Sequence, residues 1–256
     1  MQNLLKDPFL LAAGGLGDLL VSLACVDDMH KKIDVVFFAD DPTLIKQAKF
    51  LPIINQLLVF DKKQSIHKWN EFLNLENCIS TGITPKQFDY SEWKDCNVFE
   101  KYKITEFPNF INSLNRNRVA EKQAIIMLES SNSNTSKHKI ILEKNISIIA
   151  KELKDYKDDI FLIGNSLPNY ELPKNWDTAI ISSSLTLKDQ FELIRGSDIV
   201  YSVDSWVKTV SAMSGIKTVV YDNVYSNNYE ENMGGQDWGH NIFLNNWQYI
   251  ELRSQK

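Results

Sequence analysis

The chain has 256 residues, with 28 lysines and arginines against 33 aspartates and glutamates, which gives a formal net charge of -5 at pH 7. Because 43% of the residues are hydrophobic, the composition excludes a chain that is disordered throughout. The acidic balance argues against a protein whose main task is sequence-independent binding to nucleic-acid backbones. Three cysteines, Cys25, Cys78 and Cys96, are too few for a disulfide framework and lack metal-ligand spacing.

The sequence predicts no transmembrane segment. No stretch approaches the roughly 18–20 uncharged apolar residues that span a bilayer. The apolar stretch that ends at Gly14 is too short for the core of a signal peptide. We therefore expect a cytoplasmic protein, with peripheral attachment to a membrane left open.

Short apolar runs bounded by polar residues recur along the chain and predict buried strands of parallel sheets. In the first half these runs are Phe9–Ala12, Val35–Phe38 and Leu57–Phe60. In the second half they are Ile125–Leu128, Ile160–Ile163, Ile199–Tyr201 and Thr218–Tyr221. Each run is separated from the next by a spacer long enough for a helix.

The spacers carry the period of amphipathic helices. Apolar residues three and four positions apart form one stripe in each of two spacers: Ile146, Ile149, Ala150 and Leu153, then Leu187, Phe191 and Ile194 before Gly196. Alternating strands and helices predict an α/β fold with right-handed crossovers. The series occurs twice, on either side of a polar stretch from Ile83 to Gln123, so we expect two Rossmann-like domains, residues 1–118 and 119–256.

Ligands of open parallel sheets bind beyond the carboxyl ends of the strands, so the junctions that follow the apolar runs are the candidate sites. The first junction, Gly14–Asp18, opens an apolar helix. Gly15 and Gly17 fit two positions of the dinucleotide fingerprint, but Leu20 stands where the third glycine belongs. Asp18 is open to two interpretations, a helix cap or a functional carboxylate in the crevice.

The second junction, residues 129–139, is a run of small polar residues that contains Lys137 and Lys139. Such a run is suited to cradle a diphosphate, and it is equally typical of a mobile surface loop. At the third junction a strand ends before Asp204 and Ser205, a short helix of small residues follows, and Gly215 ends it. The start of that helix lies at the crevice and is suited to bind an anion.

Together these junctions resemble the heptosyltransferase type of inverting glycosyltransferase, family 9. The resemblance rests on the Gly15-x-Gly17-Asp18 opening, on the lysines of the second junction, and on the segment from Ser184 to Gly215. It implies two Rossmann-like domains that face a cleft, the GT-B type. The N-terminal domain would hold the acceptor and the C-terminal domain the nucleotide sugar.

The resemblance also implies roles for particular residues. Asp18 corresponds to the catalytic base of the family. The donor-binding set that it implies is Gly15, Gly17, Lys137, Lys139, Asp204, Ser205, Lys208 and Thr209. The chain departs from the family pattern at two positions, because Trp206 stands in place of a glycine and Thr209 in place of a histidine.

The implied activity is transfer of a hexosyl or heptosyl group from a nucleotide-diphosphate sugar to an acceptor hydroxyl, with inversion. The sequence holds no Asp-x-Asp motif, so we expect neither a metal nor a cofactor. The acceptor class, whether glycan, lipid-linked glycan, protein or nucleobase, stays open. We expect its contacts within Ile83–Gln123, whose aromatic residues include Phe88, Tyr90, Trp93, Phe107 and Phe110.

Other functions compete with this one. A dinucleotide-dependent oxidoreductase would use Asp40, at the end of the second strand, to bind a ribose, although Leu20 and Asp18 argue against it. A non-catalytic sugar-binding relative would explain the altered positions Trp206 and Thr209. A nucleotide-sugar epimerase is a further activity that the same fold allows.

Overall fold

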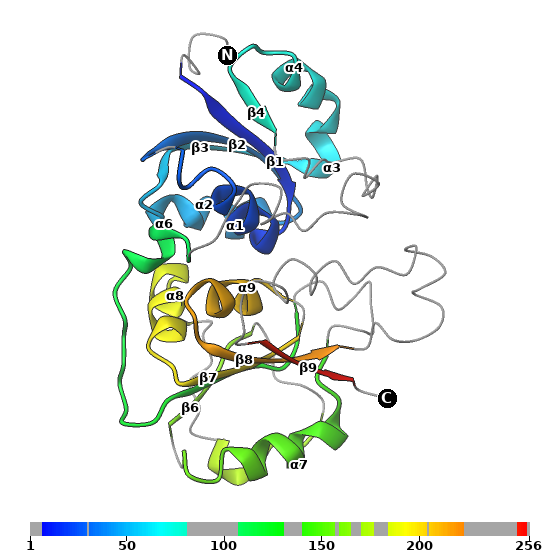
Figure 1. Cartoon of the computed structure of the whole chain (residues 1–256). Coiled ribbons are helices and arrows are strands. Elements are labelled where there is room, and N and C mark those ends of the chain that lie inside the picture. Colours follow the sequence, from blue (N-terminus) through cyan, green and yellow to red (C-terminus); the bar gives the residue numbers. More distant parts are fainter. Residues whose placement is uncertain are drawn as a thin grey trace. The chain divides into compact units, whose positions relative to one another are not determined.

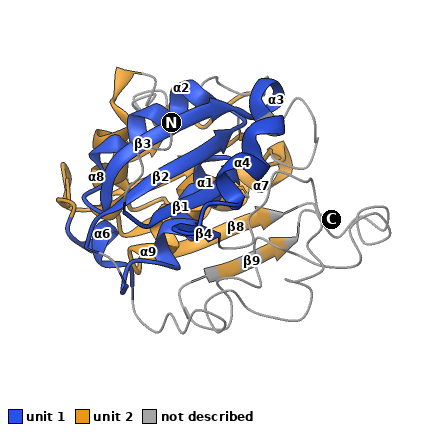
Figure 2. Cartoon of the chain, turned by 90° about the horizontal axis from the view of Figure 1, so that it is seen from above, with its two compact units in different colours: residues 1–113 blue, residues 114–256 orange. Residues whose placement is uncertain are grey.

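The computed structural model of the chain describes residues 7–29, 31–80, 107–130, 140–156, 159–164, 170–176, 184–203, 205–222 and 250–254. The chain divides into two compact units, Met1–Ser113 and Leu114–Lys256, which Figure 2 shows in different colours. Among the described residues, no helix combines the length and the apolar character needed to cross a bilayer.

The first unit contains a parallel sheet in the order β3-β2-β1-β4. Its strands are β1 (Phe9–Gly14), β2 (Ile33–Ala39), β3 (Ile54–Asp61) and β4 (Cys78–Ser80). The three apolar runs predicted in this half all form strands, and the two central ones are fully buried. β4 was not predicted, because three half-buried residues give too short a pattern.

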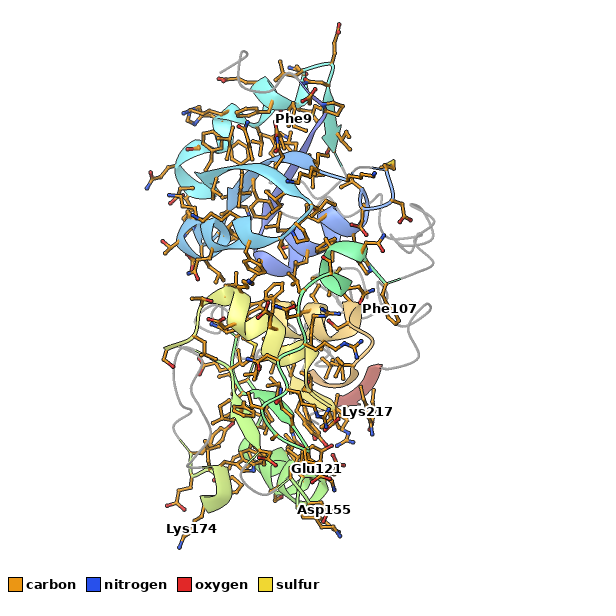
Figure 3. All side chains as sticks on the ribbon, turned by 90° about the vertical axis from the view of Figure 1, so that its left-hand side faces the viewer. Phe9, Phe107, Glu121, Asp155, Lys174 and Lys217 are labelled. Atoms are coloured by element: carbon orange, nitrogen blue, oxygen red, sulfur yellow. The ribbon has the colours of Figure 1, made fainter. Side chains whose placement is uncertain are left out.

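Helices lie on both faces of this sheet (Figure 1). They are α1 (Leu16–Ala24), α2 (Pro42–Gln47), η1 (Ala48–Phe50), α3 (Lys62–Ser65), η2 (Ile66–Lys68), α4 (Trp69–Leu73) and α6 (Asn109–Asn112). Trp69 and Phe72 of α4 pack with Phe38 in edge-to-face geometry, at centroid distances of 5.4 and 6.2 Å. Phe9 of β1 is fully buried in the same cluster (Figure 3).

The second unit contains a parallel sheet in the order β6-β5-β7-β8-β9. Its strands are β5 (Ala124–Met127), β6 (Ile160–Leu162), β7 (Ile199–Ser202), β8 (Lys217–Asp222) and β9 (Ile250–Ser254). The first four match the runs predicted from the sequence. The prediction of two Rossmann-like parallel-sheet domains is therefore confirmed.

Two layers of helices cover this second sheet (Figure 1). α7 (Glu143–Glu152) lies on one face, and α8 (Leu187–Arg195) and α9 (Trp206–Met213) lie on the other; a 3-10 turn, η4, spans Lys174–Trp176. Asp155 and Lys174 are exposed and point away from the unit in Figure 3. α9 ends as predicted before Gly215, whose φ of 69° closes a Schellman motif with Ile216 N–H bonded to Ser211 C=O at 3.0 Å.

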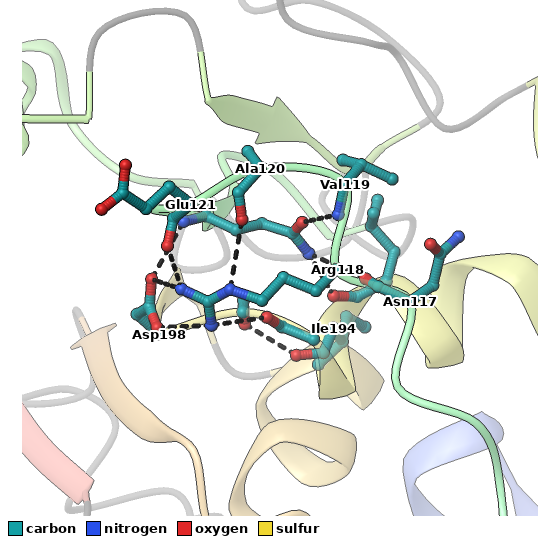
Figure 4. Close-up of polar contacts among 11 residues, drawn as sticks. Asn117, Arg118, Val119, Ala120, Glu121, Ile194 and Asp198 are labelled. Carbon is teal, nitrogen blue, oxygen red and sulfur yellow. Dashed lines mark hydrogen bonds and ion pairs between the residues drawn. The ribbon is translucent and has the colours of Figure 1, made fainter.

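A clamp around Arg118 fixes the start of the second unit to its sheet (Figure 4). The guanidinium meets both carboxylate oxygens of Asp198, at 2.8 and 2.9 Å. It also donates to the carbonyls of Ala120, Glu121 and Gly196. The bonds to Gly196 and Asp198 join positions far apart in the sequence. They hold the segment that enters β5 against the turn between α8 and β7.

Buried Gln123 and Gly196 complete the clamp. The Gln123 amide donates to Leu193 C=O at 2.8 Å and accepts from Val119 N–H at 3.0 Å. A Cβ on Gly196 would lie 2.1 Å from Asn117 O, so a glycine is needed there for close approach. These contacts give residues 117–123 to the second unit, which explains why the units divide before Leu114, whereas the sequence placed the boundary after Arg118.

The clamp predicts a pH-dependent stability. Burial alone would raise the pKa of Asp198, but bonds from Arg118 and from Gln123 N–H outweigh it and hold that pKa below its ordinary value. The stability that this carboxylate contributes is therefore present above the unfolded pKa of about 4 and is lost as the pH falls through the lower folded pKa. The side chains of Arg118 and Asp198 are 43% and 33% exposed, so solvent screens their attraction. We therefore expect Asp198→Asn to lower the free energy of unfolding at pH 7 by about 1 kcal/mol.

The measurement is denaturant unfolding of the wild type and of Asp198→Asn between pH 7 and pH 3. The difference between their free energies of unfolding should shrink below about pH 4. Lys188→Ala serves as the control, because Lys188 is half exposed and meets Glu192 only at 3.8 Å. That variant should change stability by about 0.5 kcal/mol or less. A destabilisation by Asp198→Asn that is equally large at pH 3 would contradict this account of the clamp.

Candidate functional site

Each sheet has a point where the chain reverses the direction in which it adds strands. In the first unit this point lies between β1 and β4, and in the second it lies between β5 and β7. Ligands of open α/β sheets bind in the crevice beyond the carboxyl ends of the strands at such a point. The first predicted junction follows β1, the second follows β5 and the third follows β7. All three therefore lie at these reversal points.

At the first junction, Asp18 both caps a helix and faces solvent. Gly15 is the N-cap of α1, and Asp18 occupies the third helical position. The Oδ2 atom of Asp18 accepts a hydrogen bond from Gly15 N–H at 2.8 Å, while the Asp18 side chain is exposed. The carboxylate thus stabilises the helix start and stays accessible to a ligand. The two interpretations of Asp18 are compatible with each other.

The surroundings of this junction disfavour a dinucleotide. Leu20, which stands where the fingerprint needs its third glycine, lies within α1 and is fully buried. Asp40, which would have to bind a ribose, pairs with Lys62 at 3.1 Å. The carboxylate of Asp18 also lies where a pyrophosphate would meet the helix start, and its negative charge would repel it. The oxidoreductase alternative is not favoured.

The second junction begins and ends beside the carboxyl end of β5. Lys137 and Lys139 lie outside the described residues. The residues that flank them are held together, because Glu129 and Ile140 form an antiparallel bridge and Ile141 N–H donates to Leu128 C=O at 2.8 Å. The described residues on either side of the two lysines are therefore paired with each other beside the carboxyl end of β5.

At the third junction, Ser205 is the N-cap of α9, as the sequence allowed, and Asp204 lies outside the described residues. Within the described start of α9, the Ser205 side chain makes no capping hydrogen bond. Its hydroxyl instead lies 3.0 Å from the hydroxyl of Ser202, the last residue of β7. Ser202 pairs with Met127 of β5, so this turn adjoins the carboxyl end of the strand that carries the second junction.

Of the two positions that depart from the family pattern, Thr209 is buried and Trp206 is half-buried. Trp206 stacks on the fully buried Phe191 of α8, with ring centroids 5.5 Å apart and 14° between the planes. Lys208 is 2% exposed, and Thr209 is 4% exposed with its hydroxyl 3.4 Å from Ser205 C=O. The indole that replaces a glycine is thus accommodated by packing on α8.

Sequence reasoning gave no role to two residues that shape these turns. The hydroxyl of Ser202 lies within hydrogen-bonding distance of the hydroxyl of Ser205. The only sign of this contact in the sequence is that Ser202 stands three positions before the cap. Gly14 has a φ of 122°, which no sequence pattern reveals beyond the Gly14-Gly15 pair itself. Of the expected acceptor segment, Phe110 is buried and so belongs to the core, whereas Phe88, Tyr90 and Trp93 lie outside the described residues.

No protein-family model and no curated protein sequence matches the chain. Solved structures do match it. The ADP-heptose LPS heptosyltransferase II of E. coli gives a TM-score of 0.56 with 10% identity, over 96% of this chain and 90% of that one. E. coli heptosyltransferase WaaC with ADP-2-deoxy-2-fluoro heptose gives 0.51 with 13% identity, over 83% and 88%. The chain has the heptosyltransferase fold.

A glycosyl transferase of family 9 from Veillonella parvula shares this fold, with a TM-score of 0.50 and 14% identity over 98% of this chain and 88% of that one. The chain spans 61% of the length of the dodecameric iron-containing heptosyltransferase TibC, at a TM-score of 0.49. The resemblance inferred from three short junctions therefore extends, at the level of fold, over most of the chain.

Proposed function

We propose that this protein is a glycosyltransferase that moves a sugar from a nucleotide-diphosphate sugar to an acceptor hydroxyl, with inversion and without a metal ion. The donor binds at the reversal point of the second unit. The acceptor meets Asp18 in the first unit. The transferred group is a hexose or a heptose.

The observation that carries this proposal is the contrast between two helix starts. At α1 the start already holds the carboxylate of Asp18, which is suited to accept a proton and unsuited to hold a phosphate. At α9 the cap is a neutral serine whose hydroxyl turns toward Ser202. Backbone N–H groups and the positive end of the helix dipole at α9 favour a bound anion.

The chemistry needs two things that these turns supply. A base must remove the proton of the acceptor hydroxyl as it attacks the anomeric carbon, and we assign this role to Asp18, whose carboxylate is exposed. The departing nucleoside diphosphate needs compensation for its developing charge, which the start of α9 and Lys137 or Lys139 provide. The sequence also offered Lys208, but its side chain is buried and is therefore left out of this role. Inversion follows from this single displacement, because the acceptor attacks opposite the leaving group.

The remaining residues of the expected site orient the donor. A carboxylate placed against the diphosphate would repel it. We therefore assign Asp204 to the sugar, where its carboxylate accepts a hydrogen bond from a hydroxyl. Ser205 and Thr209 shape the turn that receives the diphosphate. Gly15 and Gly17 keep the backbone of the first junction open to the sugar. The fold that the chain shares with heptosyltransferase II, WaaC and the family 9 glycosyl transferase supports the proposal of a glycosyltransferase.

We expect nucleoside diphosphates and their sugar conjugates to stabilise the protein against heat. A ligand at 100 times its dissociation constant adds about 2.7 kcal/mol to the free energy of unfolding, which raises the Tm by several degrees. A thermal-shift screen of adenine, uracil and guanine nucleotide sugars measures this, with NAD and NADP as controls for the oxidoreductase alternative. Stabilisation by NAD alone would contradict the proposal.

Transfer should not depend on a divalent metal, because cationic side chains and helix N–H groups compensate the leaving group. Among the described residues, no cluster of three His, Cys, Asp or Glu side chains is arranged to hold a metal ion. We expect the rate of nucleoside diphosphate release to be unchanged by EDTA. Complete loss of activity in EDTA that magnesium or manganese restores would overturn this part of the proposal.

Replacement of Asp18 by Asn should separate its two roles. The amide oxygen of Asn can accept the same hydrogen bond from Gly15 N–H, so Asp18→Asn should keep the fold and donor binding. Loss of the proton-accepting carboxylate should lower turnover by at least about a hundredfold. Asp18→Ala is the matched variant that also loses the bond to Gly15 N–H and should unfold more easily, by about 1 kcal/mol. Near-normal turnover of Asp18→Asn would leave Asp18 a purely structural role.

A further inference from the structure

The carboxylate of Asp18 lies directly against the backbone of Gly14, the last residue of β1. A Cβ at Gly14 would lie 2.3 Å from Asp18 Oδ2 and 2.8 Å from Asp18 Cγ. Real Cβ atoms essentially never come that close to another heavy atom. Gly14 also has a φ of 122°, a conformation that L side chains rarely adopt. The positive φ therefore favours glycine at this position, and the Asp18 carboxylate occupies the space that a side chain at Gly14 would fill.

We infer that Gly14 is the residue that positions the base of the proposed transferase. The absence of a side chain at Gly14 leaves the space in which Asp18 Oδ2 receives Gly15 N–H at 2.8 Å. A methyl group there would force the carboxylate to rotate away from Gly15 or force the backbone out of its turn. Either change moves the proton-accepting oxygen, and a shift of about 1 Å at a reacting group can cost about a hundredfold in rate.

The neighbouring glycine makes the inference specific. A Cβ at Gly15 would lie 3.7 Å from the same Asp18 oxygen, which is ordinary van der Waals contact. The φ of Gly15 is -93°, which any residue adopts. Of the two consecutive glycines, only Gly14 is thus placed by its geometry to control where the carboxylate lies.

The inference has a structural part, which any folded sample tests, and a catalytic part, which rests on the proposed function. The structural test is a double-mutant cycle of Gly14→Ala and Asp18→Ala, followed by thermal unfolding. Gly14→Ala should lower the Tm of the wild type by at least about 3 °C more than it lowers the Tm of Asp18→Ala, because the obstructing oxygen is gone in the second background. Gly15→Ala is the control for stability, and its effect should be the same in both backgrounds.

If Gly14→Ala alone fails to fold, the double variant still decides the matter. A double variant that folds supports the inference. A double variant that fails equally shows that the backbone conformation of Gly14, and not the Asp18 carboxylate, sets the need for glycine, which contradicts the inference. Equal Tm losses in the two backgrounds would contradict it as well, whatever the protein catalyses.

The catalytic test compares turnover with donor affinity. Gly14→Ala should lower kcat about a hundredfold while the KM for the donor changes little, and it should cost almost nothing further in Asp18→Asn. A purely structural defect would lower kcat by the same factor in the wild-type background and in the Asp18→Asn background. Wild-type kcat in Gly14→Ala overturns the inference. Absence of any transferase activity in the wild type refutes the proposed function instead, and the Tm cycle then tests the contact between Gly14 and Asp18 on its own.

Discussion

Parallel pairing is the constraint on which the rest of this structure depends. Every ladder described in the two sheets is parallel, so the connection after each strand must run back to the end of the sheet where the strands begin. The carboxyl ends of the strands therefore all lie at the same end of the sheet in each unit. Turns far apart in the sequence, such as those after β5 and β7, meet there because their strands are neighbours.

The two reversal points differ in their electrostatics, and the proposed roles follow this difference. A carboxylate already occupies the helix start beside β1, so that turn offers a proton acceptor. A neutral serine caps the helix beside β7, so the start of that helix offers compensation for negative charge. In the proposed reaction, the first unit supplies the base and the second unit binds the leaving group.

Much of the fold follows from the sequence because buried parallel strands and amphipathic helices have simple patterns. All seven predicted runs are strands, and α8 ends at Gly196 as expected. β4 and β9 were missed because one has three residues and the other carries Glu251 and Arg253 among its five. The pairing of Arg118 with Asp198 joins residues 80 positions apart, which no local pattern reveals.

The candidate site was predictable to the level of junctions and not to the level of conformation. The rule that ligands bind beyond strand ends led to Asp18 and Ser205 without a structure. It did not reveal the backbone angle of Gly14, which depends on how β1 turns into α1. Nor did it reveal that Trp206 packs on Phe191, since the contact depends on the packing of α8 beside α9.

The central claim is that the nucleotide binds the second unit, and amide chemical-shift mapping of the isotope-labelled full chain tests it most directly. On addition of the nucleoside diphosphate that stabilises the protein most, the largest changes should fall on Ser202–Thr209 and on Glu129–Ile140. The amides of Gly14–Asp18 should change little, because the start of α1 already holds a carboxylate. Changes confined to Gly14–Asp18, with none at the ends of β5 and β7, would contradict the account.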